Sequence, residues 1–225
     1  RETEKHYDVS KVDVVETPFF SEVEQPDDAV YRERFAGKDF VLFFGRHTRM
    51  KGSHVLAQSL AEVLEKHPKL HAVFVGADTD LAPGGGRMRT YIRSHNKRHS
   101  ERVHLLDPLR HDQLYPIVQK ARAILIPSLA DNLPNTCLEA MGLGKVVVAA
   151  RGSCFEQLIT DRETGFLSDP GDPTSLTAAI LDSLALSSDQ RETMGERARQ
   201  SLQRLHPDVA VPRLIDYFTQ TIENF

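Results

Sequence analysis

The stretch FVLFFGRHTRMKGSHVLAQSLAEVLEKH, residues Phe40–His67, decides the fold class. Its apolar run Phe40–Phe44 ends in Gly45 and predicts a strand buried on both faces. After the polar loop Arg46–Gly52, apolar side chains recur at helical spacing, and Ser53 is the predicted N-cap of that helix. The helical positions are Val55, Leu56, Leu60, Val63 and Leu64. A buried strand, a short loop and an amphipathic helix form the repeating unit of an α/β protein with a parallel sheet.

The same alternation continues along the chain. Further apolar strands are predicted at Leu70–Gly76, Val103–Leu106, Ala123–Pro127, Val146–Ala150 and Gly165–Asp169. Helical patterns separate them, and from Pro173 onward the pattern is helical throughout. One of the separating helices is predicted around Met88–His99, and another has Pro116 awkwardly in its first half. Because parallel strands need right-handed helical crossovers, we expect a doubly wound, Rossmann-like α/β domain with extra C-terminal helices.

Composition narrows the function classes. The chain has 225 residues, of which 40% are hydrophobic and 27% charged, and its formal net charge is −4. This acidic balance disfavours a nucleic-acid partner. No apolar run approaches the roughly 20 residues that span a bilayer. The cysteines, Cys137 and Cys154, show no metal-binding spacing, which favours a reducing compartment and a cytoplasmic location.

The loop after the first strand carries two cations, Arg46 and Lys51, just before a helix begins. Ligands of doubly wound sheets bind at the carboxyl ends of the strands, where this loop is predicted. An arginine fork, a lysine ammonium and a helix N-terminus together suit a diphosphate. The spacing differs from GxxxxGK[ST], which makes a Walker-type hydrolase an unsuitable interpretation. The alternative is a pair of solvated basic residues.

A second loop, Ser128–Asn135, leads into a helix and carries acidic candidates. Asp131 lies in the loop and Glu139 about one turn into the helix, with seven residues between them. Carboxylates are good acceptors for paired sugar hydroxyls, and the helix start is a second place for an anion. The alternative is a helix cap with an ordinary surface glutamate. A third loop, Arg151–Glu156, leaves the same predicted edge.

These motifs in this order resemble a known family. The chain shows GRxxxxKG after a strand, then PSxxD–x7–E–AMGxGxxVVA, then Glu156 followed by Gly165-Phe166-Leu167. The combination is similar to the donor-binding half of family-4 retaining glycosyltransferases, which have the GT-B fold. The resemblance covers about Val12 to Leu205.

The resemblance implies a role for each matching residue. Arg46 and Lys51 would grip the diphosphate of a nucleotide-sugar donor, such as a UDP- or GDP-linked sugar. Asp131 would face the donor sugar, and Glu139 would accept hydrogen bonds from the ribose hydroxyls. These are the expected catalytic residues: Arg46, Lys51, Asp131 and Glu139.

The backbone is expected to contribute as well. The amides of Asn135 and Thr136 would approach the phosphates, and Gly45 would let the donor come close to the chain. The base would lie near the loop Leu106–Leu109. No metal is expected, because the two cations would take its place.

The sequence departs from the family pattern in the second loop. Asp131 stands where the family has glutamate, one methylene longer. Asn132-Leu133-Pro134 stands where the family has Gly-Phe-Gly, and Pro134 has no N–H to offer a phosphate. We therefore expect any phosphate contact there to come from neighbouring amides, and the choice of donor sugar to depend on the loop around Asp131.

The resemblance also implies a domain plan. Residues 1–38 would be an interdomain linker, 39–205 the donor-binding domain, and 206–225 a helix that packs toward an N-terminal domain preceding Arg1. That missing domain would bind the acceptor, a glycan, lipid or small molecule. The expected reaction is glycosyl transfer with retention in polysaccharide, glycolipid or glycan biosynthesis.

The full-length protein would then work in the cytoplasm or associate peripherally with the inner face of the membrane. We expect the present chain to bind donor weakly and to transfer nothing alone. Two alternatives stay open: a non-catalytic sugar-nucleotide-binding or scaffold module, and a GT-B epimerase or phosphorylase relative.

Overall fold

The structure, a computed structural model, describes residues 16–20, 25–132, 134–152 and 154–223. The chain divides into two compact units. One comprises Arg1–Phe20 with Gln203–Phe225, and the other is Ser21–Leu202. Each unit is described by itself.

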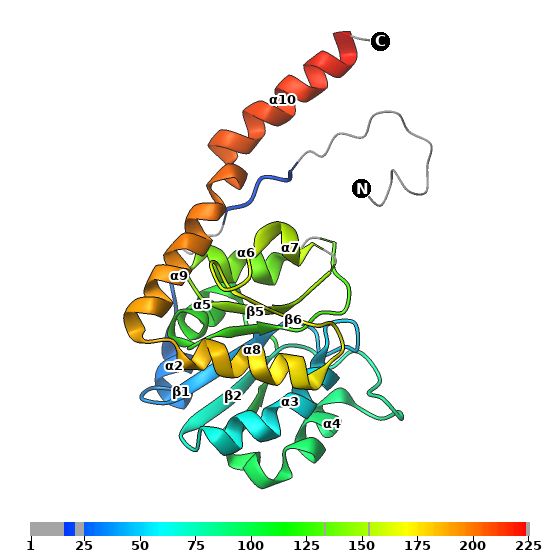
Figure 1. Cartoon of the computed structure of the whole chain (residues 1–225), viewed down its shortest axis with the longest axis vertical. Helices are drawn as coiled ribbons and strands as arrows, with labels where there is room; N and C mark the ends of the chain where they lie inside the picture. The colour runs from blue at the N-terminus through cyan, green and yellow to red at the C-terminus, as the bar shows by residue number, and fades with distance from the viewer. Residues whose placement is uncertain (1–15, 21–24, 133, 153, 224–225) are drawn as a thin grey trace. The chain divides into compact units, whose positions relative to one another are not determined.

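The larger unit contains the predicted parallel sheet (Figure 1). Its described strands run in the order β3-β2-β1-β4-β5-β6, and every neighbouring pair is parallel. Chain order therefore reverses direction between β1 and β4, which is the topological switch point of a Rossmann-like sheet. The strands are β1 Asp39–Phe44, β2 Leu70–Val75, β3 Val103–Leu106, β4 Ile124–Ile126, β5 Val147–Ala150 and β6 Phe166–Ser168.

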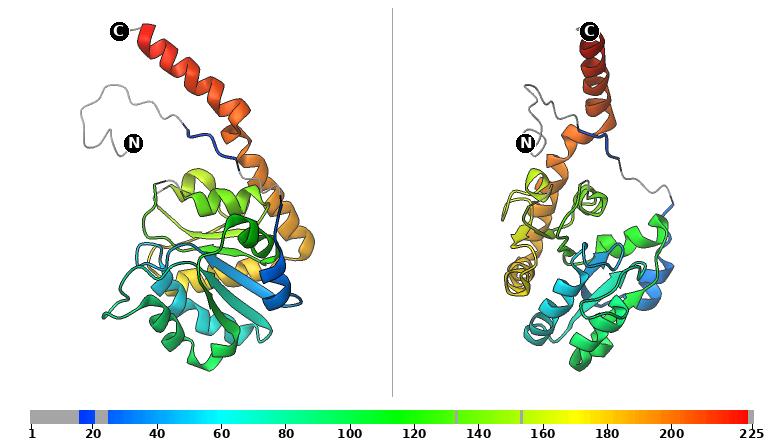
Figure 2. Two further views of the ribbon diagram at one scale, coloured as in Figure 1. Left: turned by 180° about the vertical axis from the view of Figure 1, so that it is seen from behind. Right: turned by 90° about the vertical axis from the view of Figure 1, so that its right-hand side faces the viewer.

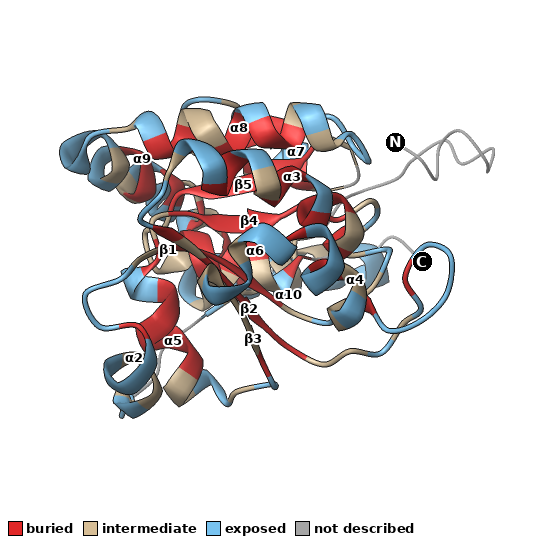
Figure 3. Cartoon of the chain, turned by 90° about the horizontal axis from the view of Figure 1, so that it is seen from below, coloured by how far each residue is buried: buried red, intermediate tan, exposed pale blue. Residues whose placement is uncertain are grey.

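Helices cover both faces of this sheet, and the strands between them are largely buried except for β3, which is partly exposed (Figures 2 and 3). The pair α3 and α8 packs together over one face, whereas α2 and α5 lie on the opposite side. The helices of this unit are α2 Ala29–Arg34, α3 Ser53–Lys66, α4 Met88–His95, α5 His111–Lys120, α6 Asn135–Gly142, α7 Phe155–Leu158, α8 Pro173–Ala185 and α9 Ser188–Ser201.

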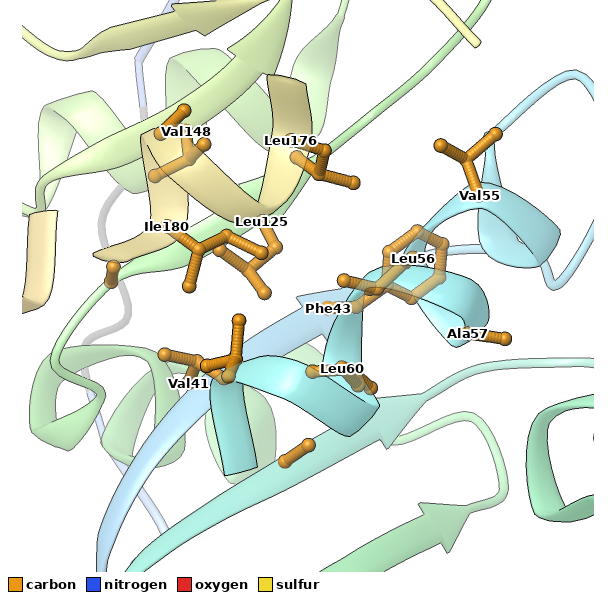
Figure 4. Packing of buried hydrophobic residues seen from close by; sticks show 14 of the residues in the cluster. Val41, Phe43, Val55, Leu56, Ala57, Leu60, Leu125, Val148, Leu176 and Ile180 are labelled. Carbon is orange, nitrogen blue, oxygen red and sulfur yellow. The ribbon is translucent and has the colours of Figure 1, made fainter. Parts of the chain in front are cut away.

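Strand β1 shows why the apolar run Phe40–Phe44 forms a central strand. Alternate side chains leave opposite faces of a strand. Val41 and Phe43 join the buried cluster under α3 and α8 (Figure 4). Phe40 packs against Phe35, with ring centroids 5.5 Å apart. Burying a side chain of this size stabilises the fold by roughly 1.5–3 kcal/mol.

Two predicted helix boundaries were wrong. Helix α3 has Gly52 as its N-cap, in the left-handed region at φ 69°, and Ser53 is its first residue instead of its cap. A Cβ atom at Gly52 would lie 1.8 Å from the Pro127 carbonyl oxygen, so the close approach of the two loops requires glycine here. The helix predicted over Met88–His99 ends at His95, and a 3-10 turn, Lys97–Arg102, follows it.

Helix α5 contains Pro116, which the sequence pattern places awkwardly. Proline has no N–H for the carbonyl four residues earlier, which belongs to Asp112. The Asp27 amide donates to that oxygen instead, at 2.9 Å. This contact fixes the segment before α2, a helix that lies in the predicted linker 1–38 and that the sequence did not predict.

The smaller unit pairs residues near the two ends of the chain. The Phe19 amide donates to the Leu205 carbonyl at 2.8 Å, and Arg204 contacts Glu16 at 2.7 Å. Helix α10, Pro207–Glu223, follows. The predictions for residues 1–15, 21–24 and 224–225 lie outside the described residues. Across the described chain, no helix combines the length and apolar character that crossing a bilayer requires.

Candidate functional site

Polar loops leave the carboxyl ends of β1, β4 and β5, and the structure joins them. The Leu129 amide donates to the Met50 carbonyl at 2.8 Å, which links the second loop to the first. The Cys154 thiol donates to the Asp131 carbonyl at 3.2 Å, which links the third loop to the second. The predicted loops 46–52, 128–135 and 151–156 therefore meet at one edge, beside the switch point between β1 and β4.

The end of β1 lies close to two neighbours. A Cβ atom at Gly76, which follows β2, would lie 1.8 Å from the Gly45 carbonyl oxygen, so the two strand ends approach as only glycine allows. A Cβ atom at Gly45 would in turn lie 3.9 Å from Cγ2 of Thr136. The first loop therefore begins beside the start of α6, and Arg46, the next residue, is exposed there.

Lys51 and Asp131 form an ion pair across the first two loops. Lys51 Nζ lies 2.5 Å from Asp131 Oδ2, although 80 positions separate them in the chain. The side chains are 28% and 11% exposed, so the pair is largely shielded from water. The Lys51 amide also donates to the Thr48 hydroxyl at 3.1 Å, which fixes the loop backbone. The two residues are thus held together at the site without a ligand.

The start of α6 presents backbone N–H groups to the same edge. Pro134 is its N-cap, and the Pro134 carbonyl accepts from the Cys137 amide at 2.8 Å and the Leu138 amide at 3.1 Å. The amides of Asn135 and Thr136 precede these first intrahelical bonds. Such N–H groups and the positive end of the helix dipole form a place for an anion.

Glu139 lies on α6 with its side chain only 14% exposed. Burial raises the pKa of its carboxyl group, and the nearby His111 acts in the opposite direction. His111 Nε2 lies 3.9 Å from Glu139 Oε1. Burial and the Glu139 charge raise the pKa of Tyr115 to about 12. The sequence motifs did not indicate His111 and Tyr115 as site residues. Their place in the chain could have indicated them, because α5 follows β3 and its first turns therefore start from the carboxyl edge of the sheet.

Arg89 is a further site residue that the sequence motifs did not indicate. Its Nη2 donates to the carbonyls of Gly76 at 2.9 Å and Leu106 at 2.7 Å, which ties together the ends of β2 and β3. The same nitrogen lies 2.9 Å from Asp107 Oδ1. The loop after β3, where a base was predicted, therefore has a fixed start.

Other candidate chemistry is not supported by the described side chains. No three His, Cys, Asp or Glu side chains gather there as metal ligands. Cys137 is fully buried, and burial raises the pKa of its thiol. Cys137 is therefore a packing residue, because a thiolate is the reactive form.

The sequence profile described as "Glycosyl transferases group 1" matches residues 27–201, which include the sheet and all of the loops above. The chain belongs to this glycosyltransferase family. Among curated relatives, it is 31% identical over 157 residues to the D-inositol 3-phosphate glycosyltransferase of Corynebacterium jeikeium. That alignment covers 69% of this chain and 37% of the relative.

Solved structures place this glycosyltransferase chain in the GT-B fold. Sucrose-phosphate synthase from Thermosynechococcus elongatus superposes with a TM-score of 0.70 at 22% identity, covering 89% of this chain and 50% of that one. Anabaena HepE, solved with UDP and glucose, gives 0.69 at 23% identity, covering 84% and 50%. The chain thus spans about half the length of these two solved structures, and less of the curated relative.

Proposed function

We propose that this chain is the donor-binding half of a retaining glycosyltransferase and that it binds a nucleoside diphosphate sugar. One observation carries the proposal: Lys51, Asp131 and the start of α6 come together at the carboxyl edge beside the switch point. Ligands of open α/β sheets bind at this position. Family membership and the similarity to HepE, solved with UDP and with UDP-glucose, support a nucleotide-sugar donor.

The diphosphate would lie between Arg46, Lys51 and the amides of Asn135 and Thr136. An ammonium group carries three donors, and its bond to Asp131 uses one of them. Lys51 can therefore keep its partner while it donates to a phosphate oxygen. Arg46 is exposed beside the start of α6, from which its guanidinium would approach the other phosphate.

The two carboxylates would accept hydrogen bonds from the sugar hydroxyls of the donor. Asp131 lies in the loop that faces the diphosphate site, so it would accept from hydroxyls of the transferred sugar. Glu139 lies further along α6, where its shielded carboxyl group would accept from the paired ribose hydroxyls. Gly45 leaves room for the donor at the end of β1, and the base would lie along Leu106–Leu109.

In the proposed reaction, the bond between the anomeric carbon and the diphosphate oxygen breaks. A bond from the anomeric carbon to an acceptor hydroxyl oxygen forms with retained configuration, and the acceptor proton passes to the leaving diphosphate. Negative charge grows on the diphosphate, where Arg46, Lys51 and the α6 amides stabilise it without a metal. A glycan, lipid or small-molecule acceptor would be held by a further domain of a cytoplasmic or membrane-associated protein.

Calorimetric titration with UDP, GDP and ADP tests the donor site. Saturable binding is expected for one of them, and Lys51→Ala should weaken it roughly 10- to 150-fold, because a charge-assisted hydrogen bond contributes about 1.5–3 kcal/mol. Lys69→Ala, at an exposed turn before β2, is the matched control. Wild-type chain that binds none of the three, or an affinity unchanged by Lys51→Ala in a folded protein, would overturn the proposal.

A turnover assay tests whether this chain binds the donor without transferring its sugar. The isolated chain is expected to transfer no sugar from the donor that it binds, because the acceptor would be held elsewhere. Robust transfer to a simple alcohol or sugar acceptor by this chain alone would contradict that expectation.

A further inference from the structure

A second cluster of cations lies at the opposite edge of the sheet, where strands begin. The amino-edge pocket is a cavity of about 520 Å³ beside the starts of β1, β4 and β5. Its lining includes Lys120, Arg122, Lys145 and Arg191 together with Asp39 and Glu192. Four cations against two carboxylates leave the lining with a net positive charge. Its size is typical of a small-molecule site.

Backbone carbonyls hold three of these cations in place. Arg122 Nη2 donates to the Leu184 carbonyl at 2.7 Å, and Arg191 Nη1 donates to the Leu186 carbonyl at 2.6 Å. Lys145 Nζ donates to the Gln119 carbonyl at 2.9 Å. A carbonyl orients a cation without neutralising it. The positive charges are therefore fixed in position while most of their field remains uncompensated.

The carboxylates in the lining balance only part of this charge. Asp39 lies 2.9 Å from Arg122 Nη1, and this is the ion pair that the described residues form within the lining. Nε of Arg122 is buried with no hydrogen-bond partner among the described residues. Glu192 is exposed at the rim.

The cations also act unfavourably on one another. Burial, together with the charges of Arg191 and Lys120, lowers the pKa of Lys145 to about 8. Burial and the Arg122 charge lower the pKa of Arg191, against the opposing effect of Asp39. A bound anion would relieve this repulsion. Helix α9 adds to the positive field, because its first residue, Ser188, also lines the cavity.

We propose that the amino-edge pocket binds a small multivalent phosphate anion, such as pyrophosphate or a phosphomonoester, at a site separate from the donor site. Free N–H bonds of Lys145 and Arg191 would contact the phosphate oxygens, with Lys120 at the mouth. A phosphate supplies the negative charge and the hydrogen-bond acceptors that would complement these donors. The proposal does not depend on the donor site, because the pocket lies at the amino ends of the strands.

Pyrophosphate titration followed by amide chemical shifts tests the proposal residue by residue. The chain is titrated at constant ionic strength, kept with KCl, and inorganic phosphate serves as the second anion. Shifts are expected at the amides of Lys145 and Leu186–Arg191 and should saturate with one dissociation constant. They should persist in Lys51→Ala, whereas shifts at the donor loop should weaken there. In wild type, shifts at the pocket without any shifts at the donor loop would thus count against the proposed function and not against this pocket.

Charge variants of opposite sign complete the test. Lys145→Gln and Arg191→Gln should each weaken binding at the pocket about tenfold or more, because each removes a charge-assisted contact. Glu192→Gln, at an exposed position, should tighten it. Lys97→Gln, on an exposed turn after α4, is the control. No saturable shifts at the pocket amides, equal shifts with KCl alone, or an affinity unchanged in both folded cation variants and in Glu192→Gln would overturn the proposal.

Discussion

His47 should make this domain sensitive to acid. The residue follows Arg46 in the first loop, yet its side chain is completely buried and neither ring nitrogen has a hydrogen-bond partner among the described residues. Its ring lies 5.8 Å from Phe43 and 6.0 Å from Phe74, centroid to centroid. Burial, with a smaller effect of Arg89, lowers the pKa of His47 from 6.5 to about 4. An imidazolium cannot be solvated in that position.

The sign of the effect follows from proton binding. Between pH 6.5 and pH 4 the unfolded chain binds a proton at His47 and the folded chain does not, so the free energy of unfolding falls as the pH falls. At pH 7 both states are nearly neutral at this residue. At pH 5 the difference between the two pKa values costs about 2 kcal/mol of stability. The pKa of His104, which burial also lowers to about 4, adds a loss of its own.

Urea unfolding of wild type and His47→Met at pH 7 and pH 5 measures this contribution. Methionine has nearly the volume of histidine, fits between aromatic rings and leaves no buried polar atoms. The variant should be at least as stable as wild type at pH 7 and should lose about 2 kcal/mol less between the two pH values. The difference corresponds to a midpoint shift of about 1 M urea.

The matched control is His95→Gln, because His95 is exposed on α4. This variant should keep the pH dependence of wild type. Equal losses in wild type and His47→Met would refute the reasoning, since they would mean that the folded chain protonates His47 as readily as the unfolded chain.

Two further predictions concern the site. Glu139→Gln should weaken UDP binding severalfold but leave pyrophosphate binding at the donor loop unchanged, because the proposed partner of the carboxylate is the ribose. Parallel calorimetric titrations with UDP and pyrophosphate measure both affinities, and equal losses for the two ligands would contradict the assignment. Gly52→Ala should lower the midpoint of thermal unfolding far more than Gly84→Ala, because both glycines have positive φ but only at Gly52 would the new methyl meet a backbone carbonyl, at 1.8 Å. Equal shifts in these two variants would show that the loops separate at little cost.

The strands and most helices could be predicted because their residues obey one spacing rule each. Phe40–Phe44 is apolar throughout, and Leu70–Gly76 is apolar except for His71. Such a run is typical of a strand that is covered on both faces. The predicted strand at Ala123–Pro127 was found as Ile124–Ile126 for the same reason. The periodicity of apolar residues therefore predicted the fold class, and the Rossmann-like strand order followed from the handedness of the crossovers.

Helix α2 and the caps could not be predicted because tertiary contacts decide them. The α2 segment is held by a hydrogen bond to a carbonyl that Pro116 leaves free, far along the chain. Gly52 displaced Ser53 as the cap of α3 because the approach of Pro127 leaves no room for a side chain. In each case the atom that determines the local structure belongs to another element, so a local sequence pattern cannot predict it.

The same limit applies to the candidate site. Motif spacing indicated Lys51, Asp131 and Glu139 separately, but the sequence does not show that Lys51 and Asp131 form an ion pair. His111 and Arg89 could not be predicted because each acts through a partner on another element. The partner of His111 is Glu139, and the partners of Arg89 are the ends of β2 and β3.

Phosphate binding at the amino-edge pocket should depend on pH, because the cations of the two proposed anion sites are held differently. At the donor loops a carboxylate, Asp131, neutralises Lys51, so a diphosphate must share an ammonium that already has an anionic partner. At the amino-edge pocket a neutral carbonyl holds Lys145, and burial together with neighbouring cations lowers its pKa to about 8. Raising the pH through 8 removes the Lys145 charge, although Arg122, Arg191 and Lys120 remain cationic beside Asp39 and Glu192. Phosphate affinity at the pocket should therefore fall across that range.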